Sequence, residues 1–88
     1  MHESTVMKGL MSKIEELALA NKSSKVTGVH VKLGALSSFS EDHFQEHFEL
    51  AAKGGIADGA KLFLTMDQDI TSPSAQNVLL EEIDLERF

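Results

Sequence analysis

The first three residues, Met1, His2 and Glu3, combine groups that can bind a transition-metal ion. The amine of Met1, the deprotonated backbone amide of His2 and the imidazole of His2 can close two fused chelate rings around one ion. Three nitrogen ligands in one plane suit nickel(II) or copper(II), which favour square-planar coordination. The fourth ligand must come from elsewhere, and Glu3 or a loop residue is a candidate. The alternative is a solvated histidine, and the spacing alone does not decide between the two.

Two further histidines, His43 and His47, lie four residues apart in the segment HFQEH. On a helix both side chains could reach one metal ion, but the glutamate that follows the first histidine in zinc-protease motifs is absent. The spacing favours the alternative, a position at the edge of the core beside an apolar helix face. His30 alternates away from the apolar positions of its strand, so we expect it to be partly exposed. The sequence contains no Gly-x-Ser-x-Gly motif and no phosphate-binding glycine loop, so it supports no enzyme.

The charge balance and the cysteine content narrow the classes of partner and site. The chain has 8 lysines and arginines against 14 aspartates and glutamates, with a formal net charge of -6. Because phosphate binding needs clustered basic side chains, we expect no nucleic-acid partner, and a cation or a basic protein fits better. No cysteine is present, so neither a disulfide nor a thiolate zinc site can form. The sequence has no apolar run of membrane-spanning length and no targeting pattern, which predicts a cytoplasmic protein without a membrane segment.

Apolar residues recur every three or four positions between residues 3 and 20, which predicts an amphipathic helix. A second helix is predicted to begin after Ser40, because Phe39 and Phe44 occupy the two positions of a hydrophobic staple around this cap. The glycines of KGG, residues 53–55, end this helix. The apolar positions are Val6, Met7, Leu10, Met11, Ile14, Leu17 and Ala18 in the first helix, and Phe44, Phe48, Ala51 and Ala52 in the second.

Three segments alternate between apolar and polar residues, as half-buried strands do. They are KVTGVHVKLGAL at residues 25–36, AKLFLTMD at residues 60–67 and NVLLEEIDLE at residues 77–86. In the third segment the alternation slips by one residue at Glu81 and Glu82, and a bulge there would restore the facing. The intervening QDITSPSAQ, residues 68–76, is polar and contains the only proline, so we expect a loop.

The order helix, strand, helix, strand, strand predicts an α+β fold, in which two helices pack on one face of a three-stranded mixed β-sheet. We expect a single domain over residues 1–88. The other face of the sheet stays partly open, and with the free edge strands it is a candidate surface for homodimerisation or for docking of a partner. The second strand is expected to turn Ala60, Leu62, Leu64 and Met66 to the core, and the open face is expected to show His30, Lys32, Phe63 and Leu79.

Four segments of the sequence, taken in order, resemble the hydrogenase nickel-incorporation family HypA/HybF. They are MHE at residues 1–3, VHVKLGALS at 29–37, FQEHFELAAKGGIADGAKL at 44–62 and LEEIDLE at 80–86. MHE alone is a weak signal, but its combination with the other segments at the family's spacing is fairly specific. The resemblance covers nearly the whole chain.

The resemblance implies a nickel(II) ion held transiently at the start of the chain. It implies His2 as the principal ligand, with the amine of Met1 and Glu3 beside it. It also implies two helices on a small mixed sheet, in agreement with the hydrophobic periodicity. The implied partners are a HypB-type GTPase and, through it, the large subunit of a nickel-iron hydrogenase or other maturation factors.

The chain departs from the family pattern in two places. Family members insert a zinc domain with two Cys-x-x-Cys pairs before the last strand, whereas this chain has only the loop 68–76 there, and structural zinc is not expected. Some members carry an aspartate implicated as a nickel ligand where this chain has Ser40. Serine still caps a helix well but offers no carboxylate, so Glu41 or Asp42 would have to replace it as a fourth ligand.

Two functions follow from the resemblance and the departures. The first is a nickel metallochaperone-like accessory protein for hydrogenase maturation, which holds nickel(II) at an exchangeable N-terminal site. The alternative is a HypA-like interaction module that docks on a maturation partner without binding metal. A small regulatory domain that shares only the fold is a third, weaker interpretation.

Overall fold

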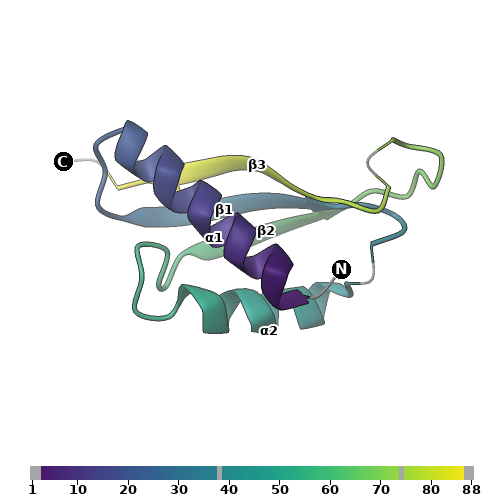
Figure 1. Ribbon diagram of the computed structural model, residues 1–88, viewed down its shortest axis with the longest axis horizontal. Helices are drawn as coiled ribbons and strands as arrows, with labels where there is room; N and C mark the ends of the chain where they lie inside the picture. The colour runs from purple at the N-terminus through teal and green to yellow at the C-terminus, as the bar shows by residue number, and fades with distance from the viewer. Residues whose placement is uncertain (1–2, 38, 74, 87–88) are drawn as a thin grey trace.

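The computed structural model describes residues 3–37, 39–73 and 75–86 of the 88-residue chain. Within these ranges the chain forms two helices and three strands in the order expected from the sequence (Figure 1). Neither helix in the described ranges is long and apolar enough to span a bilayer. The elements are α1 Glu3–Ala20, β1 Val26–Leu33, α2 Glu41–Ala52, β2 Lys61–Met66 and β3 Val78–Leu85.

The sheet has the strand order β2-β1-β3, so β1 is the central strand. β1 is parallel to β2 and antiparallel to β3, which confirms the mixed sheet. A parallel pair needs a crossover connection, and the segment containing α2 provides it. Because β1 has a neighbour on both sides and helices over one face, its inward side chains are fully buried. These are Val26, Val29, Val31 and Leu33.

Both helices contribute to one hydrophobic core on the same face of the sheet. Figure 1 shows α1 crossing the strands at an angle, with α2 beside it. The largest fully buried side chains from the helices are Ile14 of α1 and Phe44 and Phe48 of α2, and they pack in one cluster with the inward residues of β1. Ala51, expected in the apolar stripe of α2, is exposed, because it lies at the margin of the buried face.

The start of α2 follows the sequence signals closely. Ser40 is the N-cap, and its hydroxyl oxygen accepts a hydrogen bond from the backbone N–H of His43 at 3.2 Å. The rings of Phe39 and Phe44 meet edge to face, with centroids 5.2 Å apart, so the hydrophobic staple is formed. At the other end Gly54 has φ +78°, a conformation that favours glycine just after a helix.

The bulge expected in the third strand is present at Glu81. His30 is paired with Glu82, whereas the next residue, Val31, is paired with Leu80, so Glu81 is the extra residue. Because of this extra residue, the apolar side chains on both sides of it face the core, and the carboxylates that follow it reach the open face. A second register shift, near Thr27, was not expected from the sequence.

The open face of the sheet shows the predicted residues, with one error in β2. Phe63 and Leu79 are 39% and 38% exposed, and His30 and Lys32 are partly exposed. Met66, expected in the core, is instead 38% exposed. Met66 is the last residue of β2, an edge strand with a neighbour on one side only, so alternation alone does not determine its burial.

Candidate functional site

The predicted nickel ligands lie at the edge of what the structure describes. Met1 and His2 are outside the described residues, and so is the side chain of Glu3, whose backbone begins α1. The described residues nearest to them in the chain are those of the first turn of α1. The described residues that bear on the predicted N-terminal site are those from Thr5 onward and those of the loop before α2.

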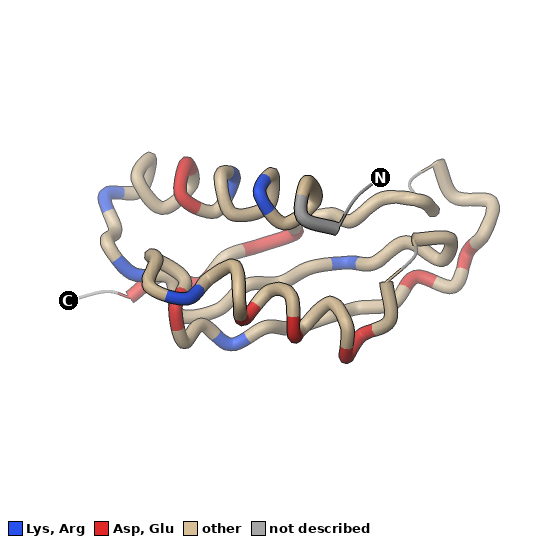
Figure 2. The backbone as a smooth tube through the Cα atoms, turned by 60° about the horizontal axis from the view of Figure 1, so that its bottom comes forward, with Lys and Arg blue, Asp and Glu red and all other residues tan. Residues whose placement is uncertain are grey.

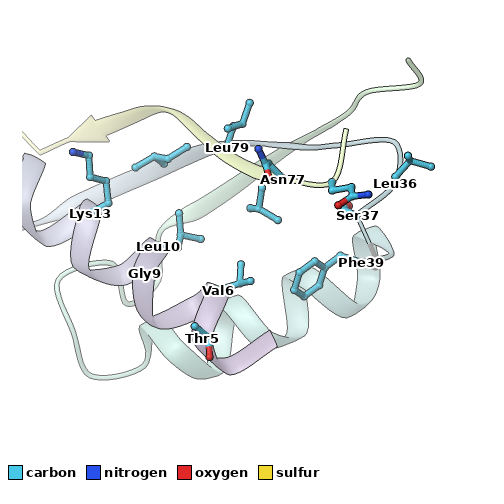
Figure 3. A pocket seen from close by; sticks show the side chains of 13 residues that line it. Thr5, Val6, Gly9, Leu10, Lys13, Leu36, Ser37, Phe39, Asn77 and Leu79 are labelled. Atoms are coloured by element: carbon cyan, nitrogen blue, oxygen red, sulfur yellow. The ribbon is translucent and has the colours of Figure 1, made fainter. Parts of the chain in front are cut away.

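A cleft of about 630 Å³ lies between the first turns of α1 and the 34–40 loop, and the beginning of β3 lines its third side. Thr5 and Gly9 line it from α1, and Leu36 and Phe39 line it from the loop (Figure 3). Ser37 also lines it, and its Oγ is buried without a hydrogen-bond partner among the described residues. The tertiary structure thus brings the start of α1 and the segment leading to Ser40 to opposite sides of one cleft.

Ser40, Glu41 and Asp42 form the region predicted to supply a fourth ligand, and they differ in whether the side chain already makes a hydrogen bond. Ser40 is engaged in capping α2 through its hydroxyl. Glu41 and Asp42 are exposed in the first turn of α2, where the partial positive charge of the helix end favours carboxylates. The carboxylates, not the serine, are therefore the groups available to a cation here.

The 68–76 loop is confirmed as a loop over its described residues, and it is tied to the segment after β1. The backbone N–H of Leu36 donates to the Ala75 carbonyl at 2.7 Å, and that of Gly34 donates to the Asn77 carbonyl at 2.9 Å. Within the loop, Asp69 accepts from the hydroxyl and the backbone N–H of Thr71 at 2.6 and 2.9 Å. The hydrogen bond from the Thr71 hydroxyl is the larger cause, and the one from the backbone N–H the smaller, of a pKa of Asp69 below its ordinary value of 3.8.

The histidine pair on α2 is in direct contact. The Nε2 atoms of His43 and His47 are 2.9 Å apart, and the ring centroids are 4.6 Å apart. In this contact one ring nitrogen donates and the other accepts. His47 also lines a hollow between α1 and α2 with Met7 and Leu50, which agrees with its expected place at the edge of the core.

A third group of ligating side chains lies on the open face of the sheet, and sequence reasoning missed it as a group. His30 Nε2 lies 2.9 Å from Asp84 Oδ2 and 3.6 Å from Glu82 Oε2. One donor atom from each of the three residues lies within 4.8 Å of the other two. The bulge after Leu80 was the available signal, because it places Glu82 and Asp84 on the same face as His30.

Neighbouring residues hold this cluster in place. The Phe63 ring stacks on the His30 ring with centroids 4.4 Å apart and planes at 10°. The Lys61 ammonium lies 5.5 Å from the centroid of the Phe63 ring, within the range of a cation–π interaction. Gly28 is paired with Asp84, and a Cβ at Gly28 would collide with the Asp84 carboxylate. The absence of a side chain at residue 28 is therefore what leaves room for the Asp84 carboxylate.

Two solved structures share this arrangement of helices and strands. One is described as the solution structure of the Ni metallochaperone HypA from Helicobacter pylori; it is 18% identical, has a TM-score of 0.82, and 97% of each chain is covered. Another, described as the solution structure of HypA protein, has a TM-score of 0.75, with 97% of this chain and 96% of that chain covered, again at 18% identity. At this identity the likeness establishes the fold.

Sequence comparison establishes the family. The family model described as hydrogenase/urease nickel incorporation, metallochaperone, hypA matches residues 1–72. The hydrogenase maturation factor HypA of Shewanella oneidensis is 38% identical over 66 residues, 75% of this chain and 56% of that protein. Its namesake in Escherichia coli K12 is 36% identical over 64 residues, 73% of this chain and 55% of that protein. The chain therefore belongs to the HypA family, and it spans about half the length of the curated relatives it matches.

Proposed function

We propose that this protein is a nickel metallochaperone-like accessory protein for the maturation of a nickel-iron hydrogenase. The observation that carries the proposal is the family match, which begins at residue 1 and so includes the proposed ligands. The Met1 amine, the His2 amide and the His2 imidazole hold the nickel(II) ion, with Glu3 beside them. The nickel ion is cargo here, and the protein performs no chemical step on it.

The described part of the molecule supports an open, exchangeable site. The first turns of α1, from Thr5 onward, lie across one cleft from the segment that leads into α2. Exposed carboxylates of Glu41 and Asp42 can complete the coordination or attract the ion. A site at the surface, with water as a competing ligand, releases its ion more readily than a buried one, as a carrier requires.

The proposed partners are a HypB-type GTPase and the hydrogenase large subunit or its maturation factors, in the cytoplasm. The net charge of -6 favours a basic docking surface on such a partner. Figure 2 shows acidic positions along α2 and β3, so the negative charge is spread over more than one face. A second copy of the chain could pair with the open face of the sheet.

Nickel titration of the untagged chain tests the proposal. We expect His2→Ala to weaken nickel(II) binding in calorimetry by about tenfold or more, because it removes one of three nitrogen ligands. Adding two residues before Met1 should weaken binding similarly, since the amine is then displaced from the chelate. The matched control is His47→Ala, which removes an imidazole in the middle of α2, outside the proposed nickel site. Equal nickel affinity in the parent and the His2 variant would exclude the N-terminal site.

A specific observation also favours the alternative function, a docking module that binds no metal. The chain has no cysteine for the family's zinc domain, and Ser40 offers no carboxylate where some relatives have one. If docking is the retained role, capture of purified maturation partners will be unchanged by nickel, by a chelator and by His2→Ala. Dependence of capture on nickel would instead support the carrier.

A further inference from the structure

The open face of the sheet carries the third group of metal-ligating side chains, none of which belongs to the N-terminal residues. We propose that His30, Glu82 and Asp84 form an open binding site for a divalent transition-metal ion with the ligand preferences of zinc(II). The inference does not rest on the nickel site proposed above, because none of its residues belongs to that site. It rests on the geometry of three side chains that the sheet pairing brings together.

The separations between the donor atoms suit such an ion. Bonds from zinc to imidazole nitrogen or carboxylate oxygen are about 2.0–2.2 Å, so neighbouring donors around a tetrahedral ion lie about 3.4 Å apart. The two separations from His30 Nε2, 2.9 and 3.6 Å, lie on either side of this value, and the ligand oxygens of Glu82 and Asp84 lie within 4.8 Å of each other. The three donor atoms are therefore close enough to converge on one ion after adjustment of the side chains.

The donor set has the chemistry of a borderline metal site. One imidazole nitrogen and two carboxylate oxygens match zinc better than magnesium or calcium, which bind through oxygen alone. The two carboxylates together carry two negative charges, which match the charge of a divalent cation. The remaining coordination positions face solvent, since the side chains of Glu82 and Asp84 are 68% and 45% exposed, and water can fill them.

Two features limit the freedom of the ligands before an ion arrives. The stack of Phe63 on His30 fixes the plane of the imidazole, and the pairing with Gly28 gives Asp84 the space it occupies. Glu82 is paired with His30 directly across the strands. A preorganised ring and carboxylate lose less conformational freedom on binding than loose surface side chains do.

The same contacts have a second explanation, an ion pair between a protonated His30 and its two carboxylates. The two explanations differ in their response to metal, because the ion pair alone predicts no saturable change when zinc is added. The full chain with His2→Ala removes the proposed N-terminal chelate from the experiment. Zinc(II) chloride is then titrated into this protein and followed by ¹H–¹⁵N correlation spectra.

We expect saturable shifts of the amides of residues 29–31 and 82–84. His30→Gln should weaken zinc binding at this face by about tenfold or more, since it removes the single nitrogen donor. Glu82→Gln should weaken zinc binding severalfold. Because Glu82 is exposed, this variant folds and tests the site even if the His30 variant does not fold. The matched control is the double variant His43→Gln and His47→Gln, which should keep the shifts at the sheet face.

Two results would overturn the proposal. One is the absence of saturable shifts at residues 29–31 and 82–84, and the other is zinc affinity at this face that survives both His30→Gln and Glu82→Gln. Loss of the shifts in the His43 and His47 double variant would also overturn it, because the ion would then be bound on α2. None of these outcomes depends on whether nickel binds at His2, so the two proposals fail separately.

Discussion

Gly28 and Asp84 face each other across β1 and β3, and the carboxylate uses the space that a glycine leaves. Substitution of Gly28 by alanine should therefore displace the Asp84 side chain and its contact with His30. We expect a loss of at most about 1 kcal/mol in the free energy of unfolding, the usual contribution of one hydrogen bond, because the half-exposed Asp84 side chain can turn away; urea denaturation measures it. The double variant Gly28→Ala and Asp84→Ala should recover most of this loss. An equal loss in both backgrounds would show that the carboxylate is not the cause.

In the 68–76 loop the backbone N–H and the hydroxyl of Thr71 both donate hydrogen bonds to the Asp69 carboxylate. Because the pKa of Asp69 is lowered in the folded protein, the ionised carboxylate stabilises this turn above its ordinary pKa of 3.8, and the contribution is lost as the pH falls through the lowered value. Thr71→Val removes the hydroxyl donor and keeps the backbone one. We expect the pKa of Asp69, followed by NMR titration, to rise part of the way toward 3.8, whereas Thr65→Val leaves it unchanged.

At the scale of the element, α2 depends on its first residues. Ser40→Ala removes the acceptor for the His43 N–H and should lower the free energy of unfolding by about 1 kcal/mol. Ser40→Asp keeps the cap and should leave stability within a few tenths of a kcal/mol. Chemical denaturation of the three proteins side by side gives both differences. A Ser40→Asp variant as unstable as Ser40→Ala would mean that the hydroxyl has a role besides capping.

At the scale of the whole molecule, one face of the sheet carries the hydrophobic core and the other is open. Phe44 of α2 is fully buried in the core, whereas Phe63 lies 39% exposed on the open face. Phe44→Ala should cost about 3–5 kcal/mol of unfolding free energy, a large share of what so small a domain has. Phe63→Ala should cost clearly less. Equal melting temperatures for the two variants would contradict this division of the sheet into a core face and an open face.

The local structure could be predicted from the sequence because each signal lies within a few residues. The helical periodicity, the cap at Ser40 and the staple that joins Phe39 to Phe44 require no knowledge of distant segments, and all are confirmed. The slip in alternation at Glu81 predicted the bulge for the same reason. Burial at the end of β2 could not be predicted, because the exposure of Met66 depends on the position of β2 at the edge of the sheet, which the local sequence does not specify.

The sequence by itself determined the element order and most of the apolar stripes, and the chelate at Met1 and His2 stays a prediction. Only the tertiary structure decided which polar groups meet. His30 and Asp84 are 54 residues apart in the chain, and nothing local relates them until β1 and β3 pair in their bulged register. Contacts between strands depend on register, and a slip of one residue would turn both carboxylates away from His30.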